Sequence, residues 1–394
     1  MSEDTSPTLI PLEEYRIPLP PTDDHLRSLW ERFRQRIWPE KEDPFLSDVS
    51  LTSAKHRLAD LAPGPAFGNA VEIIEQGFGS WLNDSSPARW LQAIVLPPCE
   101  STGLVEAWAA TRNLAVIQPP AFSERVHSSL HRQRMEAQLD ELKGPCVIPR
   151  LERWFVRHHR GLDLLRMLLD RLAERKMHCV VGCNSWAWDF LVTVASLSSV
   201  FPQPWTLPPQ TAVQLGNWFP AIVQGHPNKC LAFRRAQDGK DVMAQKKSGK
   251  LEHDFFHLLA SSSLGIPWVA WYQWRRSLRL HPETDTTSDA DRSATAGQDG
   301  HEDVIWVSEP AKAKMPDSNQ NQALLVLHAL LVHGPLEQKE LSTVLPSVDL
   351  ANVVTVLEMS RLVQRNGNAF SCRPTAYPLI RSRLLSAGIA ANVV

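Results

Sequence analysis

The sequence predicts an α/β protein: a parallel sheet with helices on both faces, a small helical subdomain and a C-terminal winged helix. From residue 90 onward, short apolar runs alternate with segments of helical periodicity, and the runs are continuously apolar. Strands of that kind are buried on both faces, as in parallel sheets whose connections are helices. Near the C-terminus, three helical segments precede an Asn-Gly turn between two extended runs, which is the order of a winged helix.

The expected strands of the sheet follow one another along the first half of the chain. They are WLQAIVL (90–96), LAVI (114–117), PCVIP (145–149), HCVVGC (178–183) and WTL (205–207). The expected helices between them lie near 103–112, 124–142, 161–176 and 187–199. Ligands of such sheets bind beyond the carboxyl ends of the strands, so the segments 97–102 and 150–157 and residue Asn184 are expected on one rim.

Composition divides the chain into five parts. We expect a helical extension over 1–89, the α/β domain over 90–225, a helical lid subdomain over 226–280, an acidic disordered linker over 281–321 and the winged helix over 322–394. The extension contains apolar helical faces near 26–37 and 53–61. Residues 281–303 hold seven acids, one arginine and little apolar surface, too little to offset the chain entropy lost on folding.

Bulk properties exclude several functional classes. A formal net charge of -2 over 394 residues offers no overall attraction to nucleic acid or anionic membrane. The polar N-terminus is unlike a signal peptide and the longest apolar run is too short for a membrane span, so we expect a cytoplasmic protein. The six cysteines include no C-x-x-C pair, so we expect neither a metal site nor a disulfide framework. No hydrolase, kinase or dinucleotide motif is present, so no catalytic residue and no cofactor are predicted.

The loop LPPCESTGLVEAW (96–108) lies where a phosphate-binding loop would follow the first strand. A working loop reads G-x-x-x-x-G-K-[ST], and its backbone N–H groups, lysine and hydroxyl hold phosphate and magnesium. Here Glu100, Ser101 and Thr102 occupy that region without a lysine, and two consecutive prolines remove donors. A carboxylate about 4 Å from phosphate costs on the order of 1 to 4 kcal/mol per charge pair. The loop is either a degenerate nucleotide site or a plain turn in which Ser101 or Thr102 caps the next helix.

The segment after the third predicted strand, 150–160, is basic where a magnesium-organising acid would be expected. Arg150 follows that strand, and the first acid is Glu152. The basic side chains of this segment are Arg150, Arg153, Arg157 and Arg160, with His158 and His159. They form either a site for an anion or acidic partner or a solvated helix face paired with nearby acids. Glu100 beside this segment suggests an internal salt link in place of nucleotide.

At the end of the fourth strand, Asn184 is a candidate for sensing phosphate or positioning water. The alternative is that Ser185 caps the following helix, which base rates favour.

In the winged helix, residues 336–394 hold six basic side chains and four acids, a thin footprint for DNA binding. Asn352 and Thr355 are the only candidate base readers on the presumed recognition helix, and Arg365 is the only basic residue of the wing. A role in protein interaction is at least as well supported.

Together these segments resemble a group of bacterial AAA/STAND-like P-loop ATPases with a C-terminal winged helix. LERWFVRHHRGLDLLRMLLDRLAE (151–174) resembles their segment after the Walker B strand, and VVGCNSWAWDFL (180–191) resembles their sensor strand. LLVLHALLVHGPLEQKELSTVL with LVQRNGNAFSCRPTAYPLIRSRL resembles their winged helix. The resemblance implies a P-loop-NTPase-like fold with Asn184 at a sensor position. The chain departs from it at the Walker A lysine, which is missing, and at Arg150, where an acid is expected.

The sequence therefore predicts a pseudo-ATPase: a non-catalytic regulatory or adaptor protein whose partner is another protein, such as an intact ATPase or a membrane complex. One alternative is a winged-helix regulator that binds DNA. A second alternative is an atypical ATP-binding protein with weak NTPase activity that uses Arg157 or Arg160 on phosphate.

Overall fold

The computed structural model describes residues 8–19, 68–142, 144–224, 231–244, 254–279, 303–308, 313–316 and 320–389. Two compact units divide the chain. Residues 1–16, 67–208 and 313–394 form the first unit, and residues 17–66 and 209–312 form the second. The helices expected near 26–37 and 53–61 lie outside the described residues.

The first unit is built on a six-stranded sheet in the order β1-β6-β2-β5-β4-β3. Its strands are β1 (Ile10–Pro11), β2 (Leu91–Leu96), β3 (Ala115–Val116), β4 (Cys146–Ile148), β5 (Cys179–Asn184) and β6 (Trp205–Thr206). The five strands from β2 to β6 are parallel, and β1 adds to β6 in the antiparallel direction. The five predicted strands are thus confirmed, and their sheet is parallel as predicted.

The strand order makes the end of β2 the natural ligand position. The chain leaves central β2 for the edge strand β3, returns through β4 to β5 on one side of β2, and then adds β6 on the other side. In open parallel sheets, ligands occupy the crevice at the carboxyl ends of the strands where the chain order reverses. β2 is that point, and the loop after it is 97–103.

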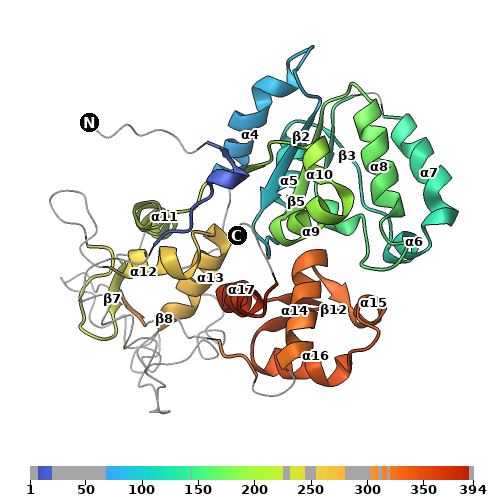
Figure 1. Ribbon diagram of the computed structural model, residues 1–394. Helices are drawn as coiled ribbons and strands as arrows, with labels where there is room; N and C mark the ends of the chain where they lie inside the picture. The colour runs from blue at the N-terminus through green and yellow to red at the C-terminus, as the bar shows by residue number, and fades with distance from the viewer. Residues whose placement is uncertain are drawn as a thin grey trace, which may run out of the picture. The chain divides into compact units, whose positions relative to one another are not determined.

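Helices connect and cover these strands (Figure 1). They are α4 (Gly68–Leu82), α5 (Leu104–Thr111), α6 (Phe122–Val126), α7 (Ser128–Asp140), α8 (Asp163–Glu174), α9 (Ser185–Ala195) and α10 (Leu197–Val200). Helix α5 packs on β3 and β4, and α9 packs on β2 and β5. Residues 93–96 of β2 and 179–183 of β5 are buried throughout, as expected for strands covered on both faces.

The C-terminal domain, residues 320–389, belongs to the same unit and contains the predicted three helices and hairpin. Its elements are α14 (Gln320–His333), β10 (Leu336–Glu337), α15 (Gln338–Val344), α16 (Leu350–Met359), β11 (Val363–Asn366), β12 (Ala369–Cys372), a 3-10 turn η4 (Pro374–Ala376) and α17 (Tyr377–Ser386). The three strands pair antiparallel in the order β10-β12-β11. The hairpin turn is Gly367–Asn368, with Gly367 at φ +61°, so Asn366 ends the strand and glycine takes the positive φ of the turn.

The second unit combines helices with a small sheet. Its elements are α11 (Ala212–Gln224), β7 (Leu231–Arg235), α12 (Phe255–Ser262), α13 (Pro267–Ser277), β8 (Leu278–Arg279) and β9 (Asp303–Val307). Trp271 and Trp274 are buried in its core beside Phe219 and Phe256. The unit thus holds strands where only helices were expected. Strand β9 lies inside the segment expected as a linker, because the apolar run after Asp303 pairs with β7 and β8.

Candidate functional site

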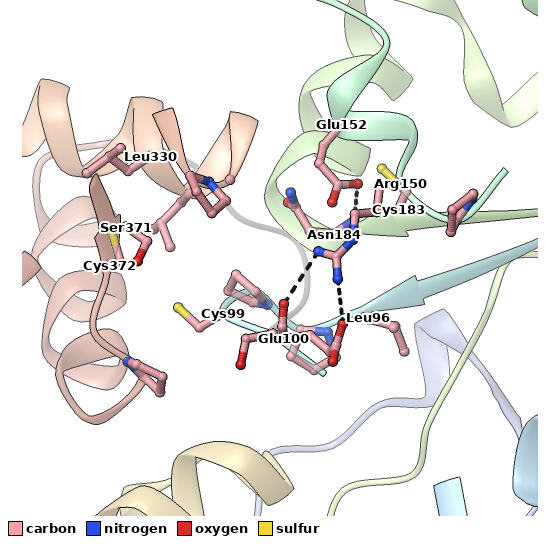
Figure 2. A pocket seen from close by; sticks show the side chains of 18 of the residues that line it. Leu96, Cys99, Glu100, Arg150, Glu152, Cys183, Asn184, Leu330, Ser371 and Cys372 are labelled. Carbon is pink, nitrogen blue, oxygen red and sulfur yellow. Dashed lines mark hydrogen bonds and ion pairs between the residues drawn. The ribbon is translucent and has the colours of Figure 1, made fainter. Parts of the chain in front are cut away.

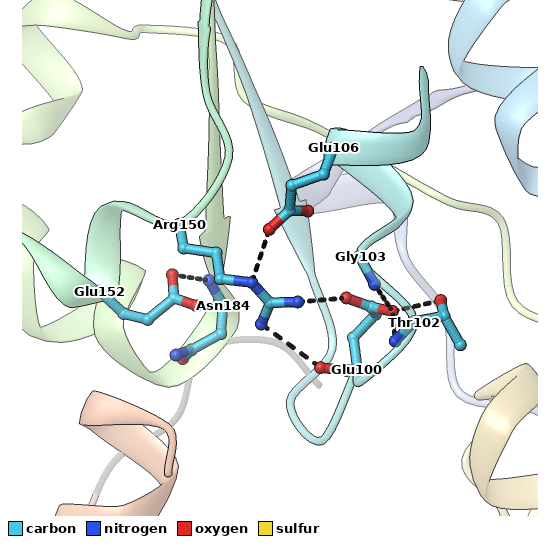
Figure 3. A network of polar contacts seen from close by, with 7 residues as sticks. All are labelled: Glu100, Thr102, Gly103, Glu106, Arg150, Glu152 and Asn184. Carbon is cyan, nitrogen blue, oxygen red and sulfur yellow. Dashed lines mark hydrogen bonds and ion pairs between the residues drawn. The ribbon is translucent and has the colours of Figure 1, made fainter. Parts of the chain in front are cut away.

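The carboxyl ends of β2, β4 and β5 meet at one edge of the sheet. Leu96 at the end of β2 stands opposite Asn184 at the end of β5. Gly182 of β5 lies so close to the Pro149 carbonyl oxygen that a Cβ would collide with it. This close approach brings the residues after β4 against those of β2 and β5. The resulting rim carries Glu100, Arg150, Glu152 and Asn184 (Figure 3).

Glu100 folds its own carboxylate into the loop between β2 and α5. Its Oε1 accepts hydrogen bonds from the backbone N–H of Gly103, at 3.0 Å, and from the N–H and the hydroxyl of Thr102. Cys99 and Gly103 both have positive φ, of 65° and 71°, which turns the loop back on itself. Backbone N–H groups at a helix start are the usual donors to a bound anion. Here a side chain of the protein is that anion.

This arrangement corrects the expected cap of α5. The N-cap residue is Gly103, which has no side chain, and neither Ser101 nor Thr102 caps the helix. Ser101 is exposed. The sequence pattern favoured a hydroxyl cap because Ser and Thr are common at that position, but the longer Glu100 side chain reaches the same donors from outside the helix.

Arg150 holds the other side of the Glu100 carboxylate. Its Nη2 lies 3.1 Å from Glu100 Oε2, and its Nε lies 2.8 Å from Glu106 Oε1. Its Nη1 also donates to the Glu100 backbone oxygen at 3.5 Å. Burial opposes the Arg150 charge, but Glu152, Glu106 and Glu100 outweigh it and raise the pKa of Arg150. The suggested salt link between Glu100 and the 150–160 segment is therefore present, and Arg150 forms it.

Glu152 lies beneath this pair in a 3-10 turn, η2 (Leu151–Arg153). It is 6% exposed and accepts the Asn184 backbone N–H at 3.2 Å. Burial raises the pKa of the Glu152 carboxyl, while the Arg150 charge acts in the opposite direction. The carboxylate thus faces the arginine and the strand ends from inside the protein.

Asn184 caps helix α9, which corrects the expectation that Ser185 does so. Its Oδ1 accepts the Ala187 N–H at 2.8 Å, and its Nδ2 donates to the Val332 carbonyl at 3.3 Å, near the end of α14. Both ends of the amide are therefore engaged by protein groups. Asn184 links the rim to the C-terminal domain, and this arrangement does not support the predicted role in sensing phosphate.

The C-terminal domain covers the rim and encloses a pocket with it (Figure 2). On one side lie the loop after β2, Arg150, Glu152 and Asn184; on the other lie Leu330, Ser371 and Cys372. A buried hydrogen bond from Trp186 Nε1 to the Tyr377 hydroxyl, at 2.9 Å, also joins the two parts. The space beyond the strand ends is thus bounded by the chain's own domain.

The remaining candidates of the 150–160 segment do not join this network. Arg153 forms no hydrogen bond or ion pair with another described residue, Arg157 Nη1 lies 3.1 Å from His328 Nδ1 of α14, and Arg160 is exposed. The interpretation as a solvated face paired with acids does not fit Arg153 and Arg157, which are half-buried and unpaired with carboxylates among the described residues.

The nucleic-acid candidates are exposed and bonded locally. Asn352 Nδ2 donates to Asp349 Oδ2 at 2.6 Å, and the Thr355 hydroxyl donates to the Ala351 carbonyl at 2.8 Å. Arg365 Nε donates to the Gly367 carbonyl at 3.1 Å. Helix α16 carries no basic residue.

The part of the chain that the structure describes offers neither a cluster of metal ligands nor a membrane-spanning helix. No group of three or more metal-ligating side chains occurs among the residues that the structure describes. Within those same residues, no helix has the length and apolarity needed to cross a membrane.

Several residues that contact the rim or the 150–160 segment could not be predicted from the sequence. Glu106 is the second carboxylate on Arg150, and its only signal was its place in the first turn of α5. Arg125, His328 and His333 come from helices distant in sequence, and no spacing in the chain connects them to the 150–160 segment.

Comparisons with known proteins find distant structural similarity only. No protein-family model and no curated protein matches the chain. The structure is similar to that of Orc1 from Aeropyrum pernix, solved in complex with DNA, with 16% identity, 84% of this chain and 96% of that chain covered, and a TM-score of 0.32. Cdc6p from Pyrobaculum aerophilum is 8% identical, with 84% and 98% covered and a TM-score of 0.33. A RuvB variant from Thermotoga maritima is 12% identical, with 82% and 98% covered and a TM-score of 0.33. At these scores the similarity establishes neither activity nor partner, and the α/β fold rests on the chain's own strand order.

Proposed function

We propose that this protein is a pseudo-ATPase: a non-catalytic regulatory or adaptor protein with a degenerate P-loop-like α/β domain and a C-terminal winged helix. One observation carries the proposal. The Glu100 carboxylate takes the loop donors and the Arg150 guanidinium that a bound phosphate would use. A nucleotide at this position would have to displace a side chain that is already hydrogen-bonded and ion-paired.

The charges of the rim also oppose a nucleotide. Glu100, Glu106 and Glu152 all face Arg150, and of these three carboxylates only Glu106 and Glu152 also act on a second arginine, Arg153. Each further negative charge brought within about 4 Å of a carboxylate costs on the order of 1 to 4 kcal/mol. No lysine lies in the loop to offset it. Tight binding of Mg-ATP in the usual manner is therefore unfavourable, and so is its hydrolysis.

The exposed surface of the C-terminal domain supports a role in protein interaction. The outer face of α16 presents Ala351, Asn352, Thr355 and Met359, and Met359 is 79% exposed. A surface for DNA relies on lysine and arginine contacts to phosphate, and this face has none. A neutral face with an exposed methionine suits a protein partner better.

A hydrolysis assay tests the catalytic part of this proposal. Release of inorganic phosphate from Mg-ATP by the purified full chain is expected to stay at the level of the buffer control. A Glu100→Lys variant controls for contaminating ATPases. Phosphate release that is the same in the wild type and in this variant does not come from this rim. Turnover by the wild type that is lost in Arg150→Ala would contradict the proposal.

DNA binding is the second candidate, supported by the exposed Arg365 at the hairpin beside α16. It predicts a salt-dependent shift of duplex DNA that disappears when residues 320–394 are removed. Absence of any shift at low salt, or a shift unaffected by Arg365→Ala, would exclude this form of DNA binding.

A further inference from the structure

A second group of arginines on the α/β domain differs from Arg150 in having no carboxylate partner. We call Arg125 of α6, Arg153 of η2 and Arg157 the arginine seam. Among the described residues, none of the three forms an ion pair with an acid. Arginines are seldom buried unless they are paired, so this group needs an explanation.

Arg125 contacts the segment 153–157, which carries the other two arginines. Arg125 Nη1 donates to the Phe155 carbonyl at 3.3 Å. Arg153 lies close enough to Arg125 to oppose its charge, and His333 of α14 experiences both Arg125 and Arg157. The Phe155 ring packs against His333, with ring centroids 4.9 Å apart. The α/β domain and α14 therefore both border the cluster.

Arg125 is the most deeply placed member. It is 9% exposed, and its Nε has no hydrogen-bond partner although it is buried. A buried N–H without an acceptor costs on the order of 1 to 3 kcal/mol, and more for a charged group. Arg153 and Arg157 are half-buried, so part of each side chain remains accessible to solvent.

The surroundings compensate this positive charge only in part. Burial lowers the pKa of Arg125 to about 10, and burial also lowers the pKa of Arg153 and of Arg157. The neighbouring imidazoles carry no charge at neutral pH, because burial lowers the pKa of His328 to about 4 and that of His333 to about 3. Arg150, with its carboxylates, has the opposite shift.

Nearby acids offset only part of the charge. Glu340 faces both Arg125 and Arg153. Glu106 also faces Arg153 but is paired with Arg150, and Glu152 lies buried against Arg150. These acids offset the charge of the seam only in part, and among the described residues none of them forms an ion pair with Arg125, Arg153 or Arg157. A phosphate group carries about -1.5 to -2 at pH 7 and has several acceptor oxygens, and guanidinium groups match its geometry.

We propose that Arg125, Arg153 and Arg157 form a binding site for a phosphate group, separate from the loop that Glu100 fills. Arg153 and Arg157 contact the phosphate from the accessible side, and Arg125 provides the charge beneath it. The source of the group is inorganic phosphate or a small phosphate ester such as a nucleoside monophosphate. This site does not depend on the proposed lack of hydrolysis, because it uses none of the groups that hold Glu100.

The test is a titration of the full chain with inorganic phosphate and with AMP, read by calorimetry and by the melting temperature. Sodium acetate at matched ionic strength controls for general charge effects. We expect saturable binding and a raised melting temperature with one or both phosphate probes, and the tighter probe identifies the source. Acetate binding as tight as phosphate binding, or no saturable binding of either probe, would overturn the proposal.

Three variants locate the site. Arg153→Gln and Arg157→Gln are each expected to weaken binding by roughly tenfold or more, equivalent to about 1.4 kcal/mol. Arg160→Gln is the matched control, since Arg160 is an exposed arginine of the same segment, and its affinity is expected to stay within twofold. Unchanged phosphate affinity in both Arg153→Gln and Arg157→Gln would show that phosphate binds elsewhere and would contradict the proposed site.

Discussion

Arg150 and Arg153 stand three residues apart, and their environments are opposite. Arg150 lies at the end of β4, where Glu100 and Glu106 meet it at 3.1 and 2.8 Å. Arg153, in η2, forms no ion pair among the described residues; it opposes the charge of Arg125, although Glu152, Glu106 and Glu340 also act on it. The pKa of the first guanidinium is raised and that of the second is lowered. The 150–160 segment thus contributes Arg150 to an ion-pair network and Arg153 and Arg157 to the arginine seam. The path of the backbone, and not the sequence pattern, separates the two groups.

The largest effect expected from this difference is on Arg150→Ala. The change leaves the little-exposed Glu100 and buried Glu152 carboxylates without their cation. Removing one partner of a buried pair typically costs about 3 to 5 kcal/mol of unfolding free energy, and urea unfolding measures it. Arg160→Ala is the control, expected within about 0.5 kcal/mol of wild type. A loss below about 1 kcal/mol for Arg150→Ala would show that the network does not stabilise the rim.

Low pH should reduce the stability of the protein through two buried histidines beside the arginine seam, His328 and His333. The pKa of His328 is lowered to about 4 and that of His333 to about 3, both mainly by burial, so folding opposes their protonation. The unfolded chain takes up these protons below about pH 6.5. Stability is therefore full above pH 6.5 and falls toward pH 4, by about 1.4 kcal/mol per pH unit for each histidine. Urea midpoints between pH 4 and 8 measure the slope. A His328→Gln and His333→Phe double variant should flatten it, and a slope equal to that of wild type would contradict the assignment.

Glu100→Gln should have an intermediate effect. The amide oxygen still accepts the Gly103 N–H, but the charge that Arg150 binds is lost. A hydrogen bond to a charged group contributes roughly 1.5 to 3 kcal/mol and a neutral one about 1, so we expect a loss of about 1 to 2 kcal/mol. Glu106→Gln is the matched comparison. Its side chain is 34% exposed, so its loss is expected to be below about 1 kcal/mol. Equal losses would mean that the deeper burial of the Glu100 carboxylate does not strengthen its ion pair with Arg150.

Arg153→Gln should have the smallest effect on stability. Arg153 forms no ion pair among the described residues and repels Arg125, so its removal is expected to change unfolding free energy by less than about 0.5 kcal/mol in phosphate-free buffer. Addition of phosphate should then separate the two proteins, because the wild type binds it more tightly and gains more stability from it. A loss of 2 kcal/mol or more without phosphate would show that Arg153 is paired in the folded protein and would remove the contrast with Arg150.

The sequence predicted the strands well because β2 and β5 are long, continuously apolar and buried on both faces. It also anticipated a link between Glu100 and the 150–160 segment, since both follow strands that end at one edge. Single-residue roles were less predictable. Asn184 and Ser185 are both good caps, and only the backbone course selects Asn184. Arg125 could not be found, because the contact between α6 and the 150–160 segment is tertiary. Strand β9 was not predicted, because the acidic composition of the residues before it indicated a linker.

The central claim is that Glu100 fills the phosphate position of the loop after β2. The most direct measurement is calorimetric titration of Mg-ATP into the Arg153→Gln full chain, in which the arginine seam is weakened and binding at the loop can be seen alone. We expect no saturable heat up to millimolar Mg-ATP, and the same result for wild type once the seam is saturated with inorganic phosphate. Micromolar binding of Mg-ATP to Arg153→Gln that disappears in the Arg150→Ala, Arg153→Gln double variant would show that the loop holds nucleotide, and would contradict the claim.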